Sequence, residues 1–136
     1  MERHRKLKDT EFERQFADST LNPALFTHEA HLRLAWIHIN KYGMDAACVN
    51  ISDQIMKFAT KHGDPNKFNK TVTIAAIKAV NHFAQKSGSN DFQDFIEEFP
   101  RLKYNFKTLL DCHYGFDIFN STTARKKYLE PDLLPF

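Results

Sequence analysis

Apolar residues recur at helical spacing along most of this chain, and short polar turns interrupt them. The pattern predicts helices over residues 10–18, 28–41, 46–61, 69–86, 91–99 and 102–113, with one further turn up to Lys127. Turn-forming residues separate these stretches at Asn22-Pro23, at residues 63–66 and at residues 87–90. The predicted fold class is therefore all-α, as a compact single-domain bundle of five to seven helices.

Several of the predicted helices begin at a residue that can cap them. Thr10, Thr27, Asp45 and Ser121 can each accept a hydrogen bond from the free backbone N–H groups of a first turn. Gly43 follows the second helix and suits a helix end. Residues 130–136 lack a helical pattern, so we expect an extended C-terminal tail whose apolar end docks on the body.

The composition supports a helical core. Thirteen phenylalanines predict a ring-filled interior, and only four glycines with few β-branched runs disfavour a sheet. No apolar run approaches transmembrane length, and the charged N-terminus lacks the apolar stretch of a secretory signal. These features predict a cytoplasmic protein with no membrane partner. Cys48 and Cys112 are then expected to be buried, unbridged thiols.

The positive charge is concentrated at the N-terminus. The net charge is +2, and residues 1–8 carry +3, which leaves −1 for the rest. We therefore predict a basic, flexible arm over residues 1–9 and one helical domain with its tail over residues 10–136. Because the body is near neutral, nucleic acid is an unlikely partner, and phosphate binding by the arm is the weakest interpretation. The sequence leaves a homo-oligomer open.

Three histidines occupy positions where apolar residues are expected. His28 and His31 fall three residues apart on the apolar stripe of the second helix, and His113 continues the stripe of the helix over 102–113. His28 and His31 lie in the first turns, where the helix dipole favours the neutral imidazole that binds metals. Each inward ring nitrogen needs a partner, so these residues predict a polar pocket.

Asn69 and Thr73 extend this pattern to a third helix end. Both align with the apolar face of the fourth helix, although they could simply satisfy the backbone at its start. If the three helix ends meet, they form one pocket. The predicted ligand-binding residues are His28, His31, Asn69, Thr73 and His113. Among them, the candidate ligands for a divalent transition metal are His28, His31 and His113.

The remaining histidines and Glu29 fall outside this predicted pocket. His4 falls in the arm, His38 at the edge of its stripe, His62 at a helix end, and His82 away from the pocket. Glu29 projects from the apolar face, which makes it a weak ligand or base. The His28-Glu29-Ala30-His31 spacing differs from that of the zinc proteases, and no phosphate loop or nucleophile elbow occurs, so no reaction is predicted.

The segment Phe26-Thr27-His28-Glu29-Ala30-His31-Leu32 resembles an uncharacterised family of small bacterial α-helical proteins. Shorter resemblances follow over residues 68–73, at His113-Tyr114, over residues 119–125 and over residues 130–133. The resemblance implies a shared α-helical fold and assigns no activity. Relatives tend to have His-Glu where this chain has Asn69-Lys70. If that histidine binds a metal in the relatives, this chain has lost one ligand, and the resemblance still implies that position 69 faces the pocket.

Two functional interpretations follow. In the first, the histidines line an internal pocket that binds a small molecule or a metal and that could be catalytic. In the second, the protein is a non-enzymatic interaction module, and its histidines form a structural hydrogen-bond network whose loss would destabilise the fold.

Overall fold

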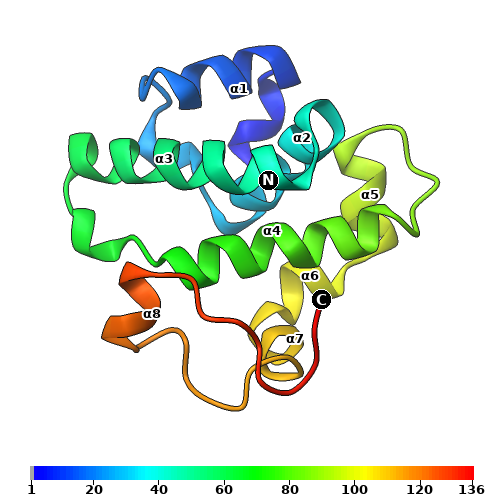
Figure 1. Cartoon of the computed structure of the whole chain (residues 1–136). Helices are drawn as coiled ribbons and strands as arrows, with labels where there is room; N and C mark the ends of the chain where they lie inside the picture. The colour runs from blue at the N-terminus through cyan, green and yellow to red at the C-terminus, as the bar shows by residue number, and fades with distance from the viewer. Residues whose placement is uncertain (1) are drawn as a thin grey trace.

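The computed structural model describes residues 2–136 and confirms the all-α class (Figure 1). Eight α-helices and three short 3-10 helices account for the regular structure of these residues, and none of them lies in a β-strand. The α-helices are α1 (Asp9–Ala17), α2 (His28–Tyr42), α3 (Met44–His62), α4 (Lys70–Ala84), α5 (Phe92–Glu98), α6 (Arg101–Tyr104), α7 (Phe106–Asp111) and α8 (Thr122–Lys126). The 3-10 helices are η1 (Arg3–Lys6), η2 (Pro23–Leu25) and η3 (Pro65–Lys67).

The three long helices α2, α3 and α4 pack against one another and form the centre of the molecule. Helix α2 is also covered by α1, α5 and α6 (Figure 1). Arg33 and Ile37 lie off the apolar stripe that carries His28 and His31, and both are nevertheless buried. A helix enclosed on several sides has no single solvent face, so its helical wheel identifies only part of its buried surface.

Two of the four predicted N-terminal caps are confirmed, and so is the helix end at Gly43. The Thr27 hydroxyl accepts from the Ala30 N–H at 3.2 Å, and the Ser121 hydroxyl accepts from the Ala124 N–H at 3.1 Å. Two starts differ: α1 already includes Asp9, and α3 begins directly after Gly43, so Thr10 and Asp45 lie within first turns. Gly43 has φ of 88°, a conformation that glycine adopts at little cost.

The helix predicted over residues 102–113 is broken in two. Asn105, with φ of −131° and ψ of 34°, separates α6 from α7. Asparagine is a weak helix former because its side chain competes for nearby backbone groups. Helix α7 ends at Asp111, and His113 consequently lies beyond the helix whose stripe predicted its direction.

The phenylalanine-rich core is confirmed, and it has two parts. Phe12, Phe16 and Phe95 are fully buried in the larger cluster, to which α1 to α7 all contribute. A smaller cluster around Leu110, Tyr114, Ile118 and Ala124 lies between α4, α7 and α8. Phe106 and Phe136 pack against both clusters, so the end of the tail joins them.

The N-terminal segment is not a free arm. Residues 3–6 form η1 against α2, and His4 is fully buried, because its ring and its neighbours bond to charged groups of α2.

Two further findings concern the thiols and the membrane, for which the sequence also raised expectations. Cys48 is half-buried, whereas Cys112 is exposed, which corrects the expectation for that thiol. Within residues 2–136, every helix is too short or too polar to cross a bilayer.

Candidate functional site

His28 is held by the backbone of α6. Its Nε2 donates to the Leu102 carbonyl at 3.0 Å, and its ring lies 4.7 Å from the Phe106 ring, centroid to centroid. A ring nitrogen that donates to a carbonyl cannot bind a metal through the same atom. This contact fits the structural interpretation of His28, which ties the start of α2 to α6.

His31 is the more unusual of the pair. The residue as a whole is half-buried, but its Nε2 is buried and has no hydrogen-bond partner among residues 2–136. Burial, together with the charge of His28, lowers the pKa of His31 to about 4, so the ring is neutral at pH 7. The neutral form was predicted correctly. The ring of His31 lies 5.7 Å from the ring of Phe26, centroid to centroid, and a phenyl ring offers no ligand atom.

Asn69 caps α4. Its Oδ1 accepts from the Val72 N–H at 3.0 Å, and its Nδ2 donates to the Ile118 carbonyl at 2.8 Å. Both ends of the amide are therefore used within the fold. Thr73 is buried one turn later. For Asn69 the structure agrees with the alternative that the side chain satisfies the backbone at the helix start.

His113 bonds to the C-terminal tail. Its Nδ1 donates to the Leu134 carbonyl at 2.7 Å, its own carbonyl accepts from the Leu133 N–H at 3.0 Å, and its ring stacks on Phe136 at 4.0 Å. The predicted docking of the tail is thereby confirmed. No hydrogen bond or ring contact within residues 2–136 joins His113 to His28 or His31, so each has separate partners.

The structure therefore gives His28, Asn69 and His113 separate partners, and within residues 2–136 it does not bring His28, His31 and His113 together as one group of metal-ligand atoms. In the part of the chain that the structure describes, one group of three possible ligand atoms lies close together, and it consists of Glu2, His4 and Glu29. His113 is separate from the two histidines of α2 because α7 ends early, at Asp111, which turns His113 toward the tail.

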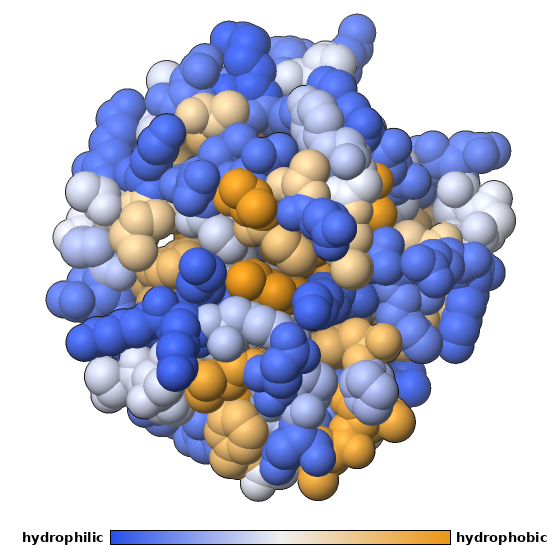
Figure 2. Space-filling view, viewed as in Figure 1, coloured by the Kyte–Doolittle hydropathy of each residue, from blue (hydrophilic) through white to orange (hydrophobic). Residues whose placement is uncertain are grey.

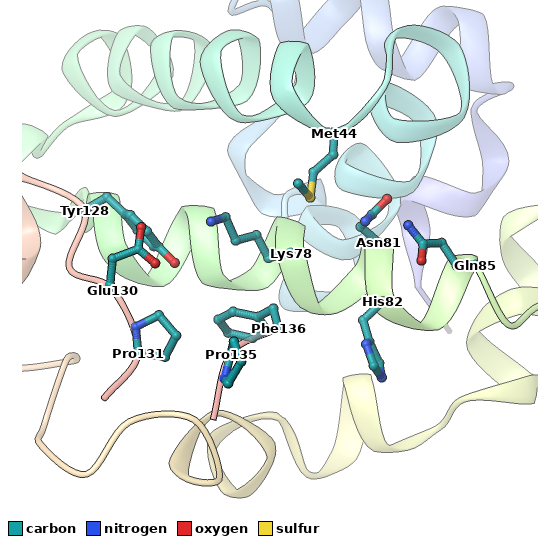
Figure 3. A pocket seen from close by; sticks show the side chains of 10 residues that line it. All are labelled: Met44, Lys78, Asn81, His82, Gln85, Tyr128, Glu130, Pro131, Pro135 and Phe136. Atoms are coloured by element: carbon teal, nitrogen blue, oxygen red, sulfur yellow. The ribbon is translucent and has the colours of Figure 1, made fainter. Parts of the chain in front are cut away.

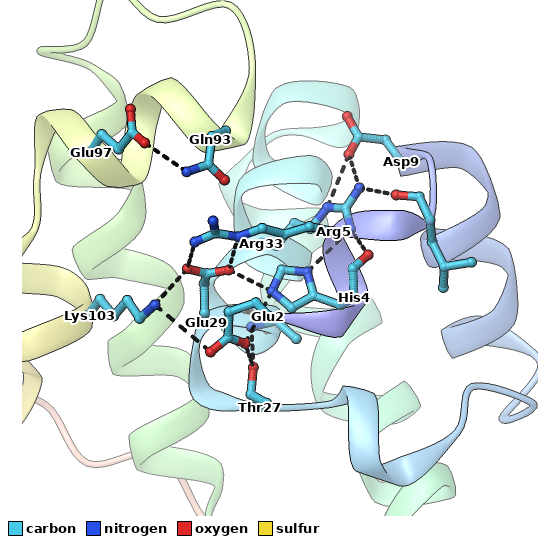
Figure 4. A network of polar contacts seen from close by, with 12 residues as sticks. Glu2, His4, Arg5, Asp9, Thr27, Glu29, Arg33, Gln93, Glu97 and Lys103 are labelled. Atoms are coloured by element: carbon cyan, nitrogen blue, oxygen red, sulfur yellow. Dashed lines mark hydrogen bonds and ion pairs between the residues drawn. The ribbon is translucent and has the colours of Figure 1, made fainter.

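Glu29 is the centre of a buried network that sequence reasoning did not identify (Figure 4). Its carboxylate accepts from His4 Nε2 at 2.7 Å, from Arg5 Nε at 2.9 Å and from Lys103 Nζ at 2.9 Å. Burial alone would raise the pKa of Glu29, but these bonds outweigh it and hold the pKa at about 2. The network fastens η1 and α6 to the first turn of α2.

The bonds around His4 fix its tautomer. Arg33 Nη1 donates to His4 Nδ1 at 3.3 Å, so Nδ1 is an acceptor and Nε2 carries the hydrogen that is donated to Glu29. Burial lowers the pKa of His4, which agrees with a neutral ring. Arg5 and Lys103 already neutralise the carboxylates of Glu2 and Glu29, and Lys103 lies 3.8 Å from Glu2. A metal ion would have to displace these cations, so the group works as an internal ion network.

Two adjoining cavities lie where the tail crosses α4. The smaller has about 250 Å³ and is polar; Figure 3 shows Asn81 and Gln85 on the side of Met44, with His82 and Phe136 on the other side of α4. Figure 2 shows apolar side chains at the centre of this face, bordered by hydrophilic ones. His82, Pro135 and Phe136 line both cavities, so the tail is the wall between them.

The larger of these, which we name the tail cavity, has about 410 Å³. Its apolar lining comes from α4, α7 and the tail, and its polar lining includes His82, Lys86, Arg101 and His113, with no Asp or Glu side chain. Neither Lys86 nor Arg101 has an ion-pair partner among residues 2–136. Burial lowers the pKa of His82, and Lys86 and His113 lower it further, as expected for a positively charged surrounding.

Hydrogen bonds fix the tail before it reaches this cavity. The Thr71 hydroxyl donates to the Lys127 carbonyl at 2.8 Å and accepts from the Leu129 N–H at 3.1 Å. The buried Tyr114 hydroxyl donates to the Leu129 carbonyl at 2.8 Å, and Asp132 accepts from the Gly115 N–H at 2.7 Å. The wall of the tail cavity is thus a built part of the fold.

Sequence reasoning missed His82, Lys86 and Arg101, because the contacts that make them neighbours come from the folded-back tail and from α6. His82 and Lys86 are four residues apart on α4, and that spacing is the one local signal that could have indicated them. Comparisons with protein-family models, curated proteins and solved structures gave no match. The functional assignment therefore depends on the geometry of the chain itself.

Proposed function

We propose that this protein binds a small organic anion, a carboxylate with an apolar body, in the tail cavity. The observation that carries the proposal is the lining: apolar side chains together with Lys86, Arg101 and two histidines, and no acidic side chain. Its volume of about 410 Å³ falls within the range of roughly 300–1,000 Å³ that small-molecule sites occupy. This proposal keeps His113 from the sequence prediction and replaces the other four residues.

The two kinds of lining have separate tasks. Phe83, Leu109 and Phe136 would cover the apolar body of the ligand, which gains free energy by leaving water. Lys86 and Arg101 would hold the carboxylate, and a guanidinium can bind it through two parallel hydrogen bonds. His82 would add a third hydrogen-bond donor, because it lies on α4 and lines the cavity together with residues of the tail (Figure 3).

The test is a titration with octanoate and 4-phenylbutyrate, beside 1-octanol as a ligand of similar body and no charge. Binding is measured by calorimetry and by the imidazole NMR signals of His82 and His113. We expect the carboxylates to bind and to shift both signals, with 1-octanol clearly weaker. Equal binding of octanoate and 1-octanol, or shifts confined to other histidines, would contradict the proposal.

Charge-removing variants assign the site. Lys86→Gln and Arg101→Gln should each weaken octanoate by about tenfold and leave 1-octanol unchanged, since one charge-assisted hydrogen bond is lost. Lys107→Gln is the matched control, because Lys107 is an exposed cation that pairs with Asp111 at 3.1 Å and does not line the tail cavity. Weakening by the control of the same size would indicate unspecific attraction by surface charge.

A further inference from the structure

A separate cleft, distinct from the two cavities at the tail, lies near the start of α4, between η3 and α8. It has about 750 Å³ and is lined from α3 by Met56, from the turn by Pro65, Asn66 and Phe68, and from the other side by Asn120, Thr122, Arg125 and Lys126. This lining again contains no Asp or Glu side chain. The segments that form it are about 60 residues apart in sequence and meet because α8 packs on α4.

The cleft combines an apolar patch with donors. Met56 is 40% exposed, and Phe68, which also lines the cleft, is buried. Opposite this patch stand Arg125 and Lys126, and neither has an ion-pair partner among residues 2–136. An exposed methionine next to unpaired cations suits a ligand that is apolar at one end and anionic at the other.

Arg125 is positioned in advance. Its Nη1 donates to the Asn66 carbonyl at 2.8 Å, which fixes the guanidinium across the cleft to the η3 turn. The other N–H groups of this guanidinium donate to no group in residues 2–136. A guanidinium that is held by one bond and keeps a free edge loses little conformational freedom when it binds an oxyanion through that edge.

The local charge favours a doubly charged oxyanion. Residues 57–70 carry Lys57, Lys61, Lys67 and Lys70 against Asp64 alone, and residues 121–127 carry three cations and no acid. None of these seven cations forms an ion pair with any residue from 2 to 136. The attraction between a cation and an anion grows with the charge of each, so a phosphate monoester gains more here than a carboxylate.

We propose that the cleft between η3 and α8 binds the phosphate monoester of a small molecule with an apolar or aromatic body. Arg125 and Lys126 hold the phosphate, Asn66 and Thr122 supply further hydrogen-bond donors at its edge, and the body lies on Met56. The site is separate from the tail cavity, since the two share no lining residue, and either proposal can fail without the other.

The probes are phenyl phosphate, inorganic phosphate and phenol, titrated at physiological ionic strength and followed by backbone NMR shifts and calorimetry. We expect phenyl phosphate to bind most tightly, inorganic phosphate several-fold more weakly, and phenol not to bind. The shifts should centre on residues 65–68 and 120–126. Shifts spread evenly over all exposed lysines, or equal affinity for the two phosphates, would overturn the proposal.

Variants separate charge from the apolar patch. Arg125→Gln should weaken phenyl phosphate and inorganic phosphate by at least about tenfold, whereas Met56→Gln should weaken phenyl phosphate alone. Arg125 also bonds the η3 turn, so its loss could disturb the fold locally, and Lys126→Gln is therefore the second charge variant. The Lys126 side chain makes no hydrogen bond to any of residues 2–136. Lys107→Gln is the control and should leave both affinities unchanged, because Lys107 is an exposed cation that pairs with Asp111 and lines neither the cleft nor the tail cavity.

A single-stranded RNA oligomer tests the competing explanation, that the cations form a nucleic-acid surface. Nucleic-acid binding releases several counterions, so its affinity falls steeply with salt. For the proposed site, RNA binds no more tightly than phenyl phosphate and competes with it only weakly. Affinity for RNA that is far higher, with a salt dependence of several released ions and insensitivity to Met56→Gln, would refute the monoester site.

Discussion

Glu29→Gln is the substitution that most directly tests the physical account of this fold. The Glu29 side chain is fully buried and accepts hydrogen bonds from His4, Arg5 and Lys103. Glutamine has nearly the same shape, but it carries no charge, and its NH2 group faces donors where an acceptor is required. The change therefore leaves Arg5 and Lys103 without their shared anion, while the packing volume is retained.

The size of the loss can be worked out in two ways. The pKa of Glu29 is held at about 2, against an ordinary value near 4.3, and each unit corresponds to about 1.4 kcal/mol, which gives about 3 kcal/mol. Removing one partner of a buried ion pair typically costs about 3–5 kcal/mol. We therefore expect Glu29→Gln to lower the free energy of unfolding by about 3 kcal/mol, a large part of the roughly 5–15 kcal/mol of a small domain.

The assay is equilibrium urea unfolding at pH 7, with Asp111→Asn as the control. Asp111 pairs with Lys107 in an exposed i,i+4 position, and its loss should cost about 0.5 kcal/mol or less. Because the pKa of Glu29 is lowered by folding, its contribution is complete above about pH 5 and disappears as the pH falls toward 2. A Glu29→Gln variant as stable as the control, or one with unchanged acid sensitivity, would refute this account.

Three further predictions concern the histidines and the tail. His31→Leu should raise the free energy of unfolding at pH 7 by about 1 kcal/mol, because an unpartnered buried nitrogen is removed. It should also reduce the stability that is lost between pH 7 and pH 4, because the pKa of His31 is lowered on folding. Urea unfolding across that pH range measures both effects. Gly115→Ala would place a Cβ 3.0 Å from Asp132 Oδ2, so faster proteolysis of the tail is expected, by roughly the fivefold that about 1 kcal/mol allows. If the tail cavity binds carboxylates, octanoate affinity should rise as the pH falls through the lowered pKa of His82, because protonation adds a positive charge; calorimetry at several pH values would show a flat profile if His82 is not involved.

The parts of the fold that local chemistry determines could be predicted from the sequence. Thr27 and Ser121 cap their helices because a short hydroxyl beside free backbone N–H groups has the same effect in almost any context. The phenylalanines of α5 are buried because their spacing already makes one apolar face. The break at Asn105 is different, since a single weak helix former is tolerated in many helices and its effect depends on how α6 and α7 pack.

The site was harder to predict because its partners are distant in the chain. Glu29 projects from the apolar stripe of α2 and would be a surface residue if the N-terminal segment did not fold over it. His113 was correctly singled out as unusual, yet its direction depends on where α7 ends. In each case the residue type carried information, while the neighbour that gives it a role came from a separate segment.

The distribution of bonds along the tail indicates which part of the tail cavity can yield to a ligand. Upstream, the buried Thr71 and Tyr114 hold Leu129 through hydrogen bonds, and breaking these would leave buried hydroxyl groups without a partner. Nearer the cavity, the Leu134 carbonyl is held by one exposed bond from His113, and Leu134 itself is 53% exposed. Water can replace that bond at little cost. Entry into the cavity is therefore cheapest by movement of the exposed Leu134, with the upstream tail and the Phe136 ring, which stacks on His113, staying in place.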